Sequence, residues 1–162
     1  MKKMNYPITP AVRVLREKKA EFEPFVFDYV EKGGTRHSAD VLGVDEHAVV
    51  KTLIFETNEK KPLIVLMHGD RQVSTKTLAR LLGVKTVAPA TPETANKLTG
   101  YLVGGTSPFG VRTKMPVYAE RTIFELDKIY INGGKRGFLV ALAPVILQNI
   151  LAPVEVEVGI ED

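Results

Sequence analysis

Two apolar segments, residues 49–55 and 63–67, lie close together near the middle of the chain and constrain its fold more than any other feature. Both are rich in Val, Ile and Leu, and the turn-forming residues 58–62 separate them. Short apolar runs that are bounded by such residues are typical of β-strands. We therefore predict that the two segments form an antiparallel pair within a sheet.

The other elements are short, because 13 Gly and 10 Pro residues interrupt the chain at close intervals. Thr9-Pro10 and Thr91-Pro92 each combine a good helix N-cap with a proline at the first helical position. Ser38 and Ser74 are further cap candidates. These signals predict helices capped at residues 9, 38, 74 and 91, a helix over 143–151, and strands over 25–30, 84–88, 117–118, 129–131 and 138–142.

The expected fold class is therefore mixed α/β, with a curled or barrel-like mixed β-sheet and peripheral helices. A length of 162 residues suits a single domain, which we predict to span residues 1–162. The net charge of +3 permits a polyanionic partner, but a plain basic surface has the same charge.

The composition excludes several kinds of chemistry. With 0 Cys, the chain has no thiolate nucleophile and no Cys-based zinc site. Its three histidines, His37, His47 and His68, lack the spacing of a helical metal pair, and we expect no carboxylate cluster to join them, so no metal and no other cofactor is expected. No apolar run approaches about 18 residues, and no apolar signal core follows the basic N-terminus, so we expect no membrane partner and a cytoplasmic location.

Three segments carry residues that suit chemistry. Lys51 lies inside an apolar strand, where a buried ammonium is costly unless it is paired or faces a cavity; alternatively, its head reaches water from an open sheet face. Gly104-Gly105 lies in a loop over 99–110, and its N–H groups can converge on an anion or oxyanion, although an ordinary turn has the same sequence. Residues 130–137 indicate a hairpin whose cations either line a pocket or lie on plain surface. His37 follows Gly33-Gly34 and is either a pocket residue or an exposed loop residue.

At these segments the sequence resembles the YbaK/EbsC family of aminoacyl-tRNA deacylases, freestanding relatives of the editing domain inserted in prolyl-tRNA synthetases. The resemblance runs through residues 9–12, 50–53, 99–105, 107–108 and 133–137, and so covers nearly the whole chain. It implies the YbaK/prolyl-tRNA synthetase-associated fold. It also implies hydrolysis of the ester that joins a wrong amino acid to tRNA, with cysteinyl-tRNA(Pro) or alanyl-tRNA(Pro) as substrate.

The resemblance implies roles for individual residues as well. Lys51 stands at the place of the family's essential lysine, which anchors the substrate near the terminal adenosine, and Gly104 and Gly105 stand in the loop against the aminoacyl group. We expect these three as the catalytic groups, acting by positioning, oxyanion stabilisation and substrate assistance without a protein nucleophile. The residues expected to bind the substrate are Phe27, Thr106, Ser107, Asn132, Gly133, Gly134 and Leu139, and those expected to bind tRNA are Arg112, Lys114, Lys135 and Arg136.

The sequence departs from the cysteinyl-deacylase pattern at three positions. Phe27 replaces a pocket tyrosine, Asn132 a serine and Leu139 an aspartate. These departures leave two functions open: trans-editing of mischarged aminoacyl-tRNA, or a catalytically silent module that binds tRNA or aminoacyl-adenosine. In both cases we expect aminoacyl-tRNA and prolyl-tRNA synthetase as partners and no DNA.

Overall fold

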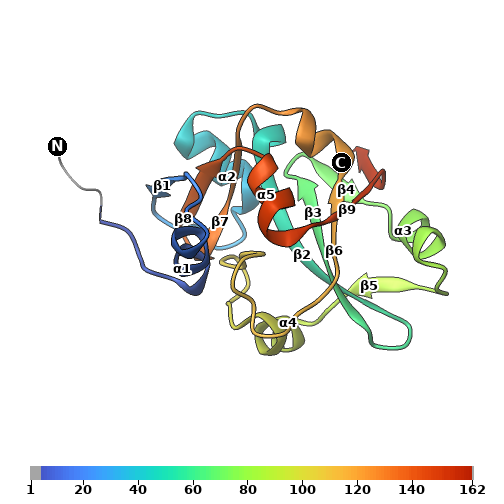
Figure 1. The fold of residues 1–162 in the computed structure, drawn as a ribbon. Helices are drawn as coiled ribbons and strands as arrows, with labels where there is room; N and C mark the ends of the chain where they lie inside the picture. The colour runs from blue at the N-terminus through green and yellow to red at the C-terminus, as the bar shows by residue number, and fades with distance from the viewer. Residues whose placement is uncertain (1–4, 162) are drawn as a thin grey trace.

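The computed structural model describes residues 5–161 as a mixed β-sheet with helices packed around it (Figure 1). Within these residues the sheet has eight strands, in the order β1-β8-β7-β2-β3-β6-β9, with β5 paired to β2; β4 and β10 form a separate pair. The expected fold class is confirmed.

The strands are β1 (Glu23–Val26), β2 (Val49–Thr57), β3 (Pro62–His68), β4 (Arg71–Val73), β5 (Val87–Pro89), β6 (Val117–Glu120), β7 (Ile129–Lys135), β8 (Phe138–Leu142), β9 (Val154–Val156) and β10 (Gly159–Glu161). The helices are α1 (Pro10–Glu17), α2 (Gly34–Leu42), α3 (Thr75–Leu82), α4 (Pro92–Thr99) and α5 (Val145–Leu151), with short 3₁₀ helices η1 (Glu46–Ala48) and η2 (Arg121–Glu125).

The predicted central hairpin is present, and it separates two cores. β2 and β3 pair antiparallel, and successive side chains of β2 alternate between the two faces. Val50 and Ile54 pack in the larger core with α1, α4 and α5, whereas Phe55 packs in a second core with α3. Figure 1 shows α1 and α3 at opposite ends of the molecule.

The helix starts follow the capping signals. The side chains of Thr9, Ser74 and Thr91 each accept a hydrogen bond from the backbone N–H three residues later. Each of these bonds satisfies a donor that a helix start otherwise leaves without a partner. None of the helices within residues 5–161 is long and apolar enough to cross a membrane.

Several predicted boundaries were wrong. The strand predicted over 84–88 begins only at Val87, because the N–H of Val84 still donates to the Ala79 carbonyl at the end of α3, and the strand predicted over 129–131 continues to Lys135. β1 ends at Val26, four residues before the predicted end, because its partner strand β8 begins at Phe138; the Phe27 N–H still donates to the Gly137 carbonyl at 2.9 Å, but Gly137, with a φ of +73°, turns the partner chain away there. α2 begins at Gly34, so Ser38 lies inside the helix, where its hydroxyl donates to the Gly34 carbonyl instead of capping. The three-residue strands β4, β9 and β10 were not predicted.

Part of one edge of β2 has no neighbouring strand. β7 pairs with β2 only at residues 49–50, and β5 pairs with it only at residues 55–57. A register shift between Asn132 and Lys135 interrupts the pairing of β7 with β8 beyond this point. Residues 51–53 of β2 therefore face a gap between β7 and β5, and this gap holds the candidate site.

Candidate functional site

A cavity of about 690 Å³ lies at this gap, between β2, α2, the 103–106 loop and the end of β7. Its floor is apolar, because Phe27, Val49 and the buried Leu139 pack together beside α2. The predicted site residues that line it are Phe27, Lys51, Gly104, Thr106, Asn132, Arg136 and Leu139.

The other predicted site residues lie outside this lining. Ser107 is fully buried, and its hydroxyl accepts a hydrogen bond from the Phe109 N–H at 3.2 Å, which gives it a structural place in the loop. A Cβ on Gly133 would overlap the ring of the buried Phe138, so close packing explains this glycine. The residues outside the lining are Gly105, Ser107, Arg112, Lys114, Gly133, Gly134 and Lys135.

Lys51 is half-buried and lines the cavity. Its Nζ donates a hydrogen bond to the carbonyl oxygen of Arg71 at the start of β4, at 2.5 Å. An ammonium has three N–H donors, and this bond fixes the direction of the head. The lysine therefore has a defined position beside the cavity, unlike a surface lysine whose head moves in water.

Side chains of the β7–β8 hairpin hold the loop over the cavity. The amide of Asn132 donates to the carbonyl oxygen of Gly104 at 3.2 Å. Arg136 donates to the carbonyl oxygen of Val103 at 2.8 Å, and its guanidinium lies 5.1 Å from the centre of the Tyr29 ring. A cation over an aromatic face is attractive. Asn132 and Arg136 therefore tether this loop to the rest of the site.

The two adjacent glycines differ in their surroundings. The N–H of Gly105 donates to the Leu102 carbonyl at 2.8 Å, which closes a turn. Within the part of the chain that the structure describes, the N–H of Gly104 donates to no protein group. The expectation that both N–H groups meet the substrate is therefore kept, as a proposal, for Gly104 alone.

Thr52 faces the gap in the sheet. Thr57 N–H donates to Lys61 of the β2–β3 hairpin, whereas the carbonyl of Ile54 accepts from Ala90 on the opposite edge, so even-numbered residues of β2 direct their backbone away from β3. The main-chain groups of Thr52 accordingly face the gap. Its hydroxyl is buried and has no hydrogen-bond partner among residues 5–161. Such groups are costly to leave unsatisfied, so Thr52 is a candidate for contact with a ligand.

Sequence reasoning missed several lining residues. Tyr29 places a phenol hydroxyl near Gly104, so the site contains a tyrosine hydroxyl although Phe27 has none. His37 lies on α2, lines the cavity and has its Nε2 3.0 Å from the Asp28 carbonyl oxygen, which answers the question that the sequence left open. The early start of α2 decides between the two alternatives for His37, because a helix beginning at Gly34 turns His37 toward Phe27.

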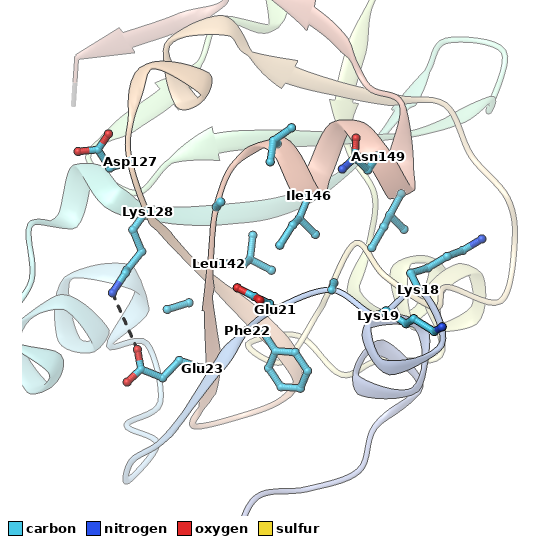
Figure 2. A pocket seen from close by; sticks show the side chains of 15 residues that line it. Lys18, Lys19, Glu21, Phe22, Glu23, Asp127, Lys128, Leu142, Ile146 and Asn149 are labelled. Carbon is cyan, nitrogen blue, oxygen red and sulfur yellow. Dashed lines mark ion pairs between the residues drawn. The ribbon is translucent and has the colours of Figure 1, made fainter.

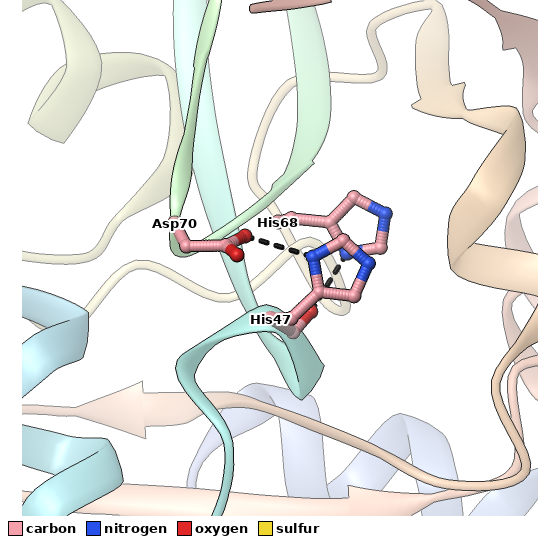
Figure 3. A group of neighbouring side chains, drawn as sticks. All are labelled: His47, His68 and Asp70. Atoms are coloured by element: carbon pink, nitrogen blue, oxygen red, sulfur yellow. Dashed lines mark hydrogen bonds and ion pairs between the residues drawn. The ribbon is translucent and has the colours of Figure 1, made fainter. Parts of the chain in front are cut away.

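His47, His68 and Asp70 form a cluster that the sequence spacing did not predict (Figure 3). The expectation that no carboxylate joins the histidines is corrected, because Nδ1 of His47 lies 2.9 Å from Asp70. Nδ1 of His68 donates to the His47 carbonyl, and its Nε2 accepts from Thr122, so both ring nitrogens are in use. The two rings stack 3.7 Å apart at 8°. In-plane lone pairs of parallel rings do not converge on one ion, so this arrangement suits hydrogen bonding better than a metal.

His68 makes the stability of the fold dependent on pH. Burial lowers the pKa of His68 below 6.5 and outweighs the hydrogen bond to the His47 carbonyl, which raises it; the charge of His47 lowers the pKa further. Below about pH 6.5 the unfolded chain therefore binds a proton that the folded chain does not, and stability falls by at most about 1.4 kcal/mol per pH unit. We expect the thermal midpoint to decrease between pH 6.5 and 5, and to decrease less in His68→Gln. An equal decrease in both proteins would contradict this assignment.

A second cavity, of about 810 Å³, lies between the α1–β1 connection, β8 and α5 (Figure 2). None of the predicted site residues lines it. Both basic and acidic side chains line it, and Lys128 pairs with Glu23 at 3.9 Å. This mixed charge provides no defined preference for an anion or a cation, so the site at β2 remains the candidate.

Comparison with known proteins identifies the family of the chain. The sequence profile of the aminoacyl-tRNA editing domain matches residues 34–150. The chain belongs to this family. The match includes Lys51, Gly104, Asn132 and the other β-strand and loop residues around the cavity from α2 onward, and it confirms the resemblance read from the sequence.

Individual relatives of this editing domain are both freestanding and part of larger enzymes. This chain is 29% identical, over 144 residues, to an Enterococcus faecalis protein named "Putative Cys-tRNA(Pro)/Cys-tRNA(Cys) deacylase EbsC". The matched region covers 88% of each of the two chains. This chain is also 36% identical, over 95 residues, to a proline–tRNA ligase of Nitratidesulfovibrio vulgaris. The matched region covers 59% of this chain and 16% of the ligase. A crystal structure titled "putative trans-editing enzyme for prolyl tRNA synthetase" has the same fold, with a TM-score of 0.81 and 21% identity over 95% of this chain and 99% of that one.

Proposed function

We propose that this protein hydrolyses the ester of mischarged aminoacyl-tRNA in trans, with cysteinyl- or alanyl-tRNA(Pro) as substrate. The observation that carries the proposal is the fixed ammonium of Lys51 beside a cavity roofed by Gly104, in a chain of the aminoacyl-tRNA editing family. The name of the Enterococcus faecalis relative, a putative Cys-tRNA(Pro)/Cys-tRNA(Cys) deacylase, supports the same substrate class.

The geometry supports catalysis by positioning. Lys51 holds the phosphate or ribose of the terminal adenosine, and the main chain and hydroxyl of Thr52 bind polar groups of the aminoacyl ester in the gap of the sheet. The N–H of Gly104 donates to the oxyanion as it forms, which is where one fixed donor contributes most. No protein nucleophile is assigned, so either the thiol of a cysteinyl substrate or a water attacks the ester carbonyl. The acyl C–O bond then breaks, and the tRNA hydroxyl leaves with the proton that the attacking group has lost. Holding the reacting groups together supplies much of the acceleration.

The apolar floor favours a small side chain. Phe27, Val49 and Leu139 offer no polar partner to the amino acid in their part of the cavity. Volume alone discriminates by about 1–3 kcal/mol per methylene, which separates small from large amino acids only moderately. Loss of the aspartate at Leu139 favours discrimination by size over recognition of a polar group.

Four basic residues provide the proposed tRNA contacts. Arg136 lies at the mouth, and Lys135 is exposed beside it. Arg112 and Lys114 follow the Gly104 loop along the chain. Contacts of this kind bind the phosphate backbone and carry little sequence information. We therefore propose that prolyl-tRNA synthetase, as a partner, imposes the choice of tRNA.

The test is release of labelled amino acid from Cys-, Ala-, Ser- and Pro-tRNA(Pro). We expect many turnovers on Cys- or Ala-tRNA(Pro) and little release from correctly charged Pro-tRNA(Pro), because proline is larger than either editing substrate. Release equal to the non-enzymatic rate, with binding retained, would contradict the proposal and establish a silent binding module instead. Purified protein heated above its thermal midpoint serves as the control for spontaneous hydrolysis.

A further inference from the structure

A turn that the proposed function does not use holds Lys51 in place. The turn joins β3 to β4 and contains Gly69 and Asp70. Arg71 follows directly, and its carbonyl oxygen accepts the hydrogen bond from Lys51 Nζ. The position of the ammonium therefore depends on the conformation of this turn.

Asp70 fixes the turn from two sides. One carboxylate oxygen lies 2.9 Å from Nδ1 of His47, and the other accepts a hydrogen bond from the Arg71 guanidinium at 3.0 Å. Burial opposes ionisation of Asp70, but the hydrogen bond and charge of His47 and the charge of Arg71 outweigh it, so the pKa of Asp70 lies below its usual value. Asp70 is thus an ionised acceptor at neutral pH, and hydrogen bonds to such acceptors are stronger than neutral ones.

His47 is itself anchored to a distant part of the chain. Its carbonyl oxygen accepts a hydrogen bond from Nδ1 of the buried His68 at 2.7 Å, and the two rings stack. Nε2 of His68 accepts in turn from the hydroxyl of Thr122, in η2, at 2.6 Å. Figure 3 shows His47 between Asp70 and His68. The turn is therefore tied, through two histidines, to a segment on the far side of β3.

We propose that Asp70 is a positioning residue for Lys51: the carboxylate, clamped by His47, sets the Arg71 carbonyl that aims the lysine ammonium at the substrate. Asp70 does not line the cavity and touches no reacting atom. The proposal rests on the proposed function for the role of Lys51 in substrate binding, whereas the dependence of the lysine position on Asp70 is independent of it.

The experiment compares Asp70→Ala with the conservative Asp70→Asn, whose amide oxygen still accepts from His47. We expect Asp70→Ala to lower kcat/KM for deacylation by about 10- to 100-fold, the scale of a small misplacement of a functional group, and Asp70→Asn to recover most of this loss. Asp127→Asn, on the exposed loop before β7, is the matched control and is expected to behave as wild type.

Repeating the Asp70→Ala substitution in the Lys51→Ala variant distinguishes the positioning role of Asp70 from a purely structural one. The measured quantity is the affinity for a 3′-alanylamido-adenosine probe. If Asp70 acts through Lys51, Asp70→Ala causes no further loss of this affinity in a protein that already carries Lys51→Ala, because substitutions that act through the same residue are not additive. An equal loss in both backgrounds would overturn the proposal. Probe binding is measured below the thermal midpoint of each variant, so that only folded protein is compared.

A crystal structure of Asp70→Ala keeps this inference separate from the proposed function. We expect Nζ of Lys51 to leave the Arg71 carbonyl in the variant. If Nζ stays in place, the positioning role is overturned, whatever the activity of the wild type. If Nζ moves but the wild type releases no amino acid from any tRNA, the positioning role holds and the proposed function fails.

Discussion

Replacing Lys51 with Ala is expected to lower kcat/KM for deacylation of the preferred mischarged tRNA by about 100-fold. A hydrogen bond from a charged group contributes about 1.5–3 kcal/mol, and each 1.4 kcal/mol corresponds to a factor of ten. The structure fixes this ammonium beside the cavity by its bond to Arg71, so its position is set before substrate arrives. Preorganisation of this kind makes the loss larger than for a mobile surface lysine.

Two variants accompany the Lys51 measurement. Lys135→Ala removes an exposed lysine outside the cavity lining and is expected to weaken tRNA binding modestly, with kcat unchanged. Lys51→Arg keeps the charge but replaces a compact ammonium with a planar fork, so it is expected to restore only part of the activity. Full activity of Lys51→Ala, with a folded protein by thermal unfolding, would refute the role of this lysine.

Local signals in the sequence were sufficient for most of the fold. The caps at Thr9, Ser74 and Thr91 mark helix starts because the cap bond spans only three residues. The central hairpin follows from two adjacent apolar runs. By contrast, the true end of β1 depends on where its partner β8 begins, more than 110 residues later, and no pattern within β1 carries that information.

The candidate site also combines features that local sequence predicts with features that depend on distant contacts. The position of Lys51 inside an apolar strand indicated a partner or a cavity, and the structure contains both. The contact between His47 and Asp70 spans 23 residues and arises only because the β2–β3 hairpin returns the chain to the start of β2. Spacing rules for metal pairs apply within one helix, so they could not find this cluster.

The sequence did not show which of the two adjacent glycines, Gly104 or Gly105, offers its N–H to the substrate. Substitution of Gly104 is the second prediction with a large expected effect on activity. Gly104→Ala is expected to lower kcat by about 100-fold, the cost of losing one oxyanion donor. Gly104 has a φ of +88°, which an L-residue rarely adopts, and a Cβ would lie 2.7 Å from the hydroxyl of Tyr29. The variant therefore turns the peptide that carries the Gly104 N–H and displaces Tyr29. The ring can swing away, so the stability cost is limited to about 1–3 kcal/mol.

Gly105→Ala is the matched control, because its effect has a different origin. A Cβ there would lie 2.7 Å from the backbone nitrogen of Arg136 and 2.8 Å from the carbonyl carbon of Lys135, and hairpin backbone cannot swing aside. We expect the larger decrease in thermal midpoint for Gly105→Ala and the larger decrease in kcat per folded molecule for Gly104→Ala. Measuring both quantities for both variants decides the matter: if Gly104→Ala loses stability alone and keeps its kcat, the N–H of Gly104 does not act on the substrate.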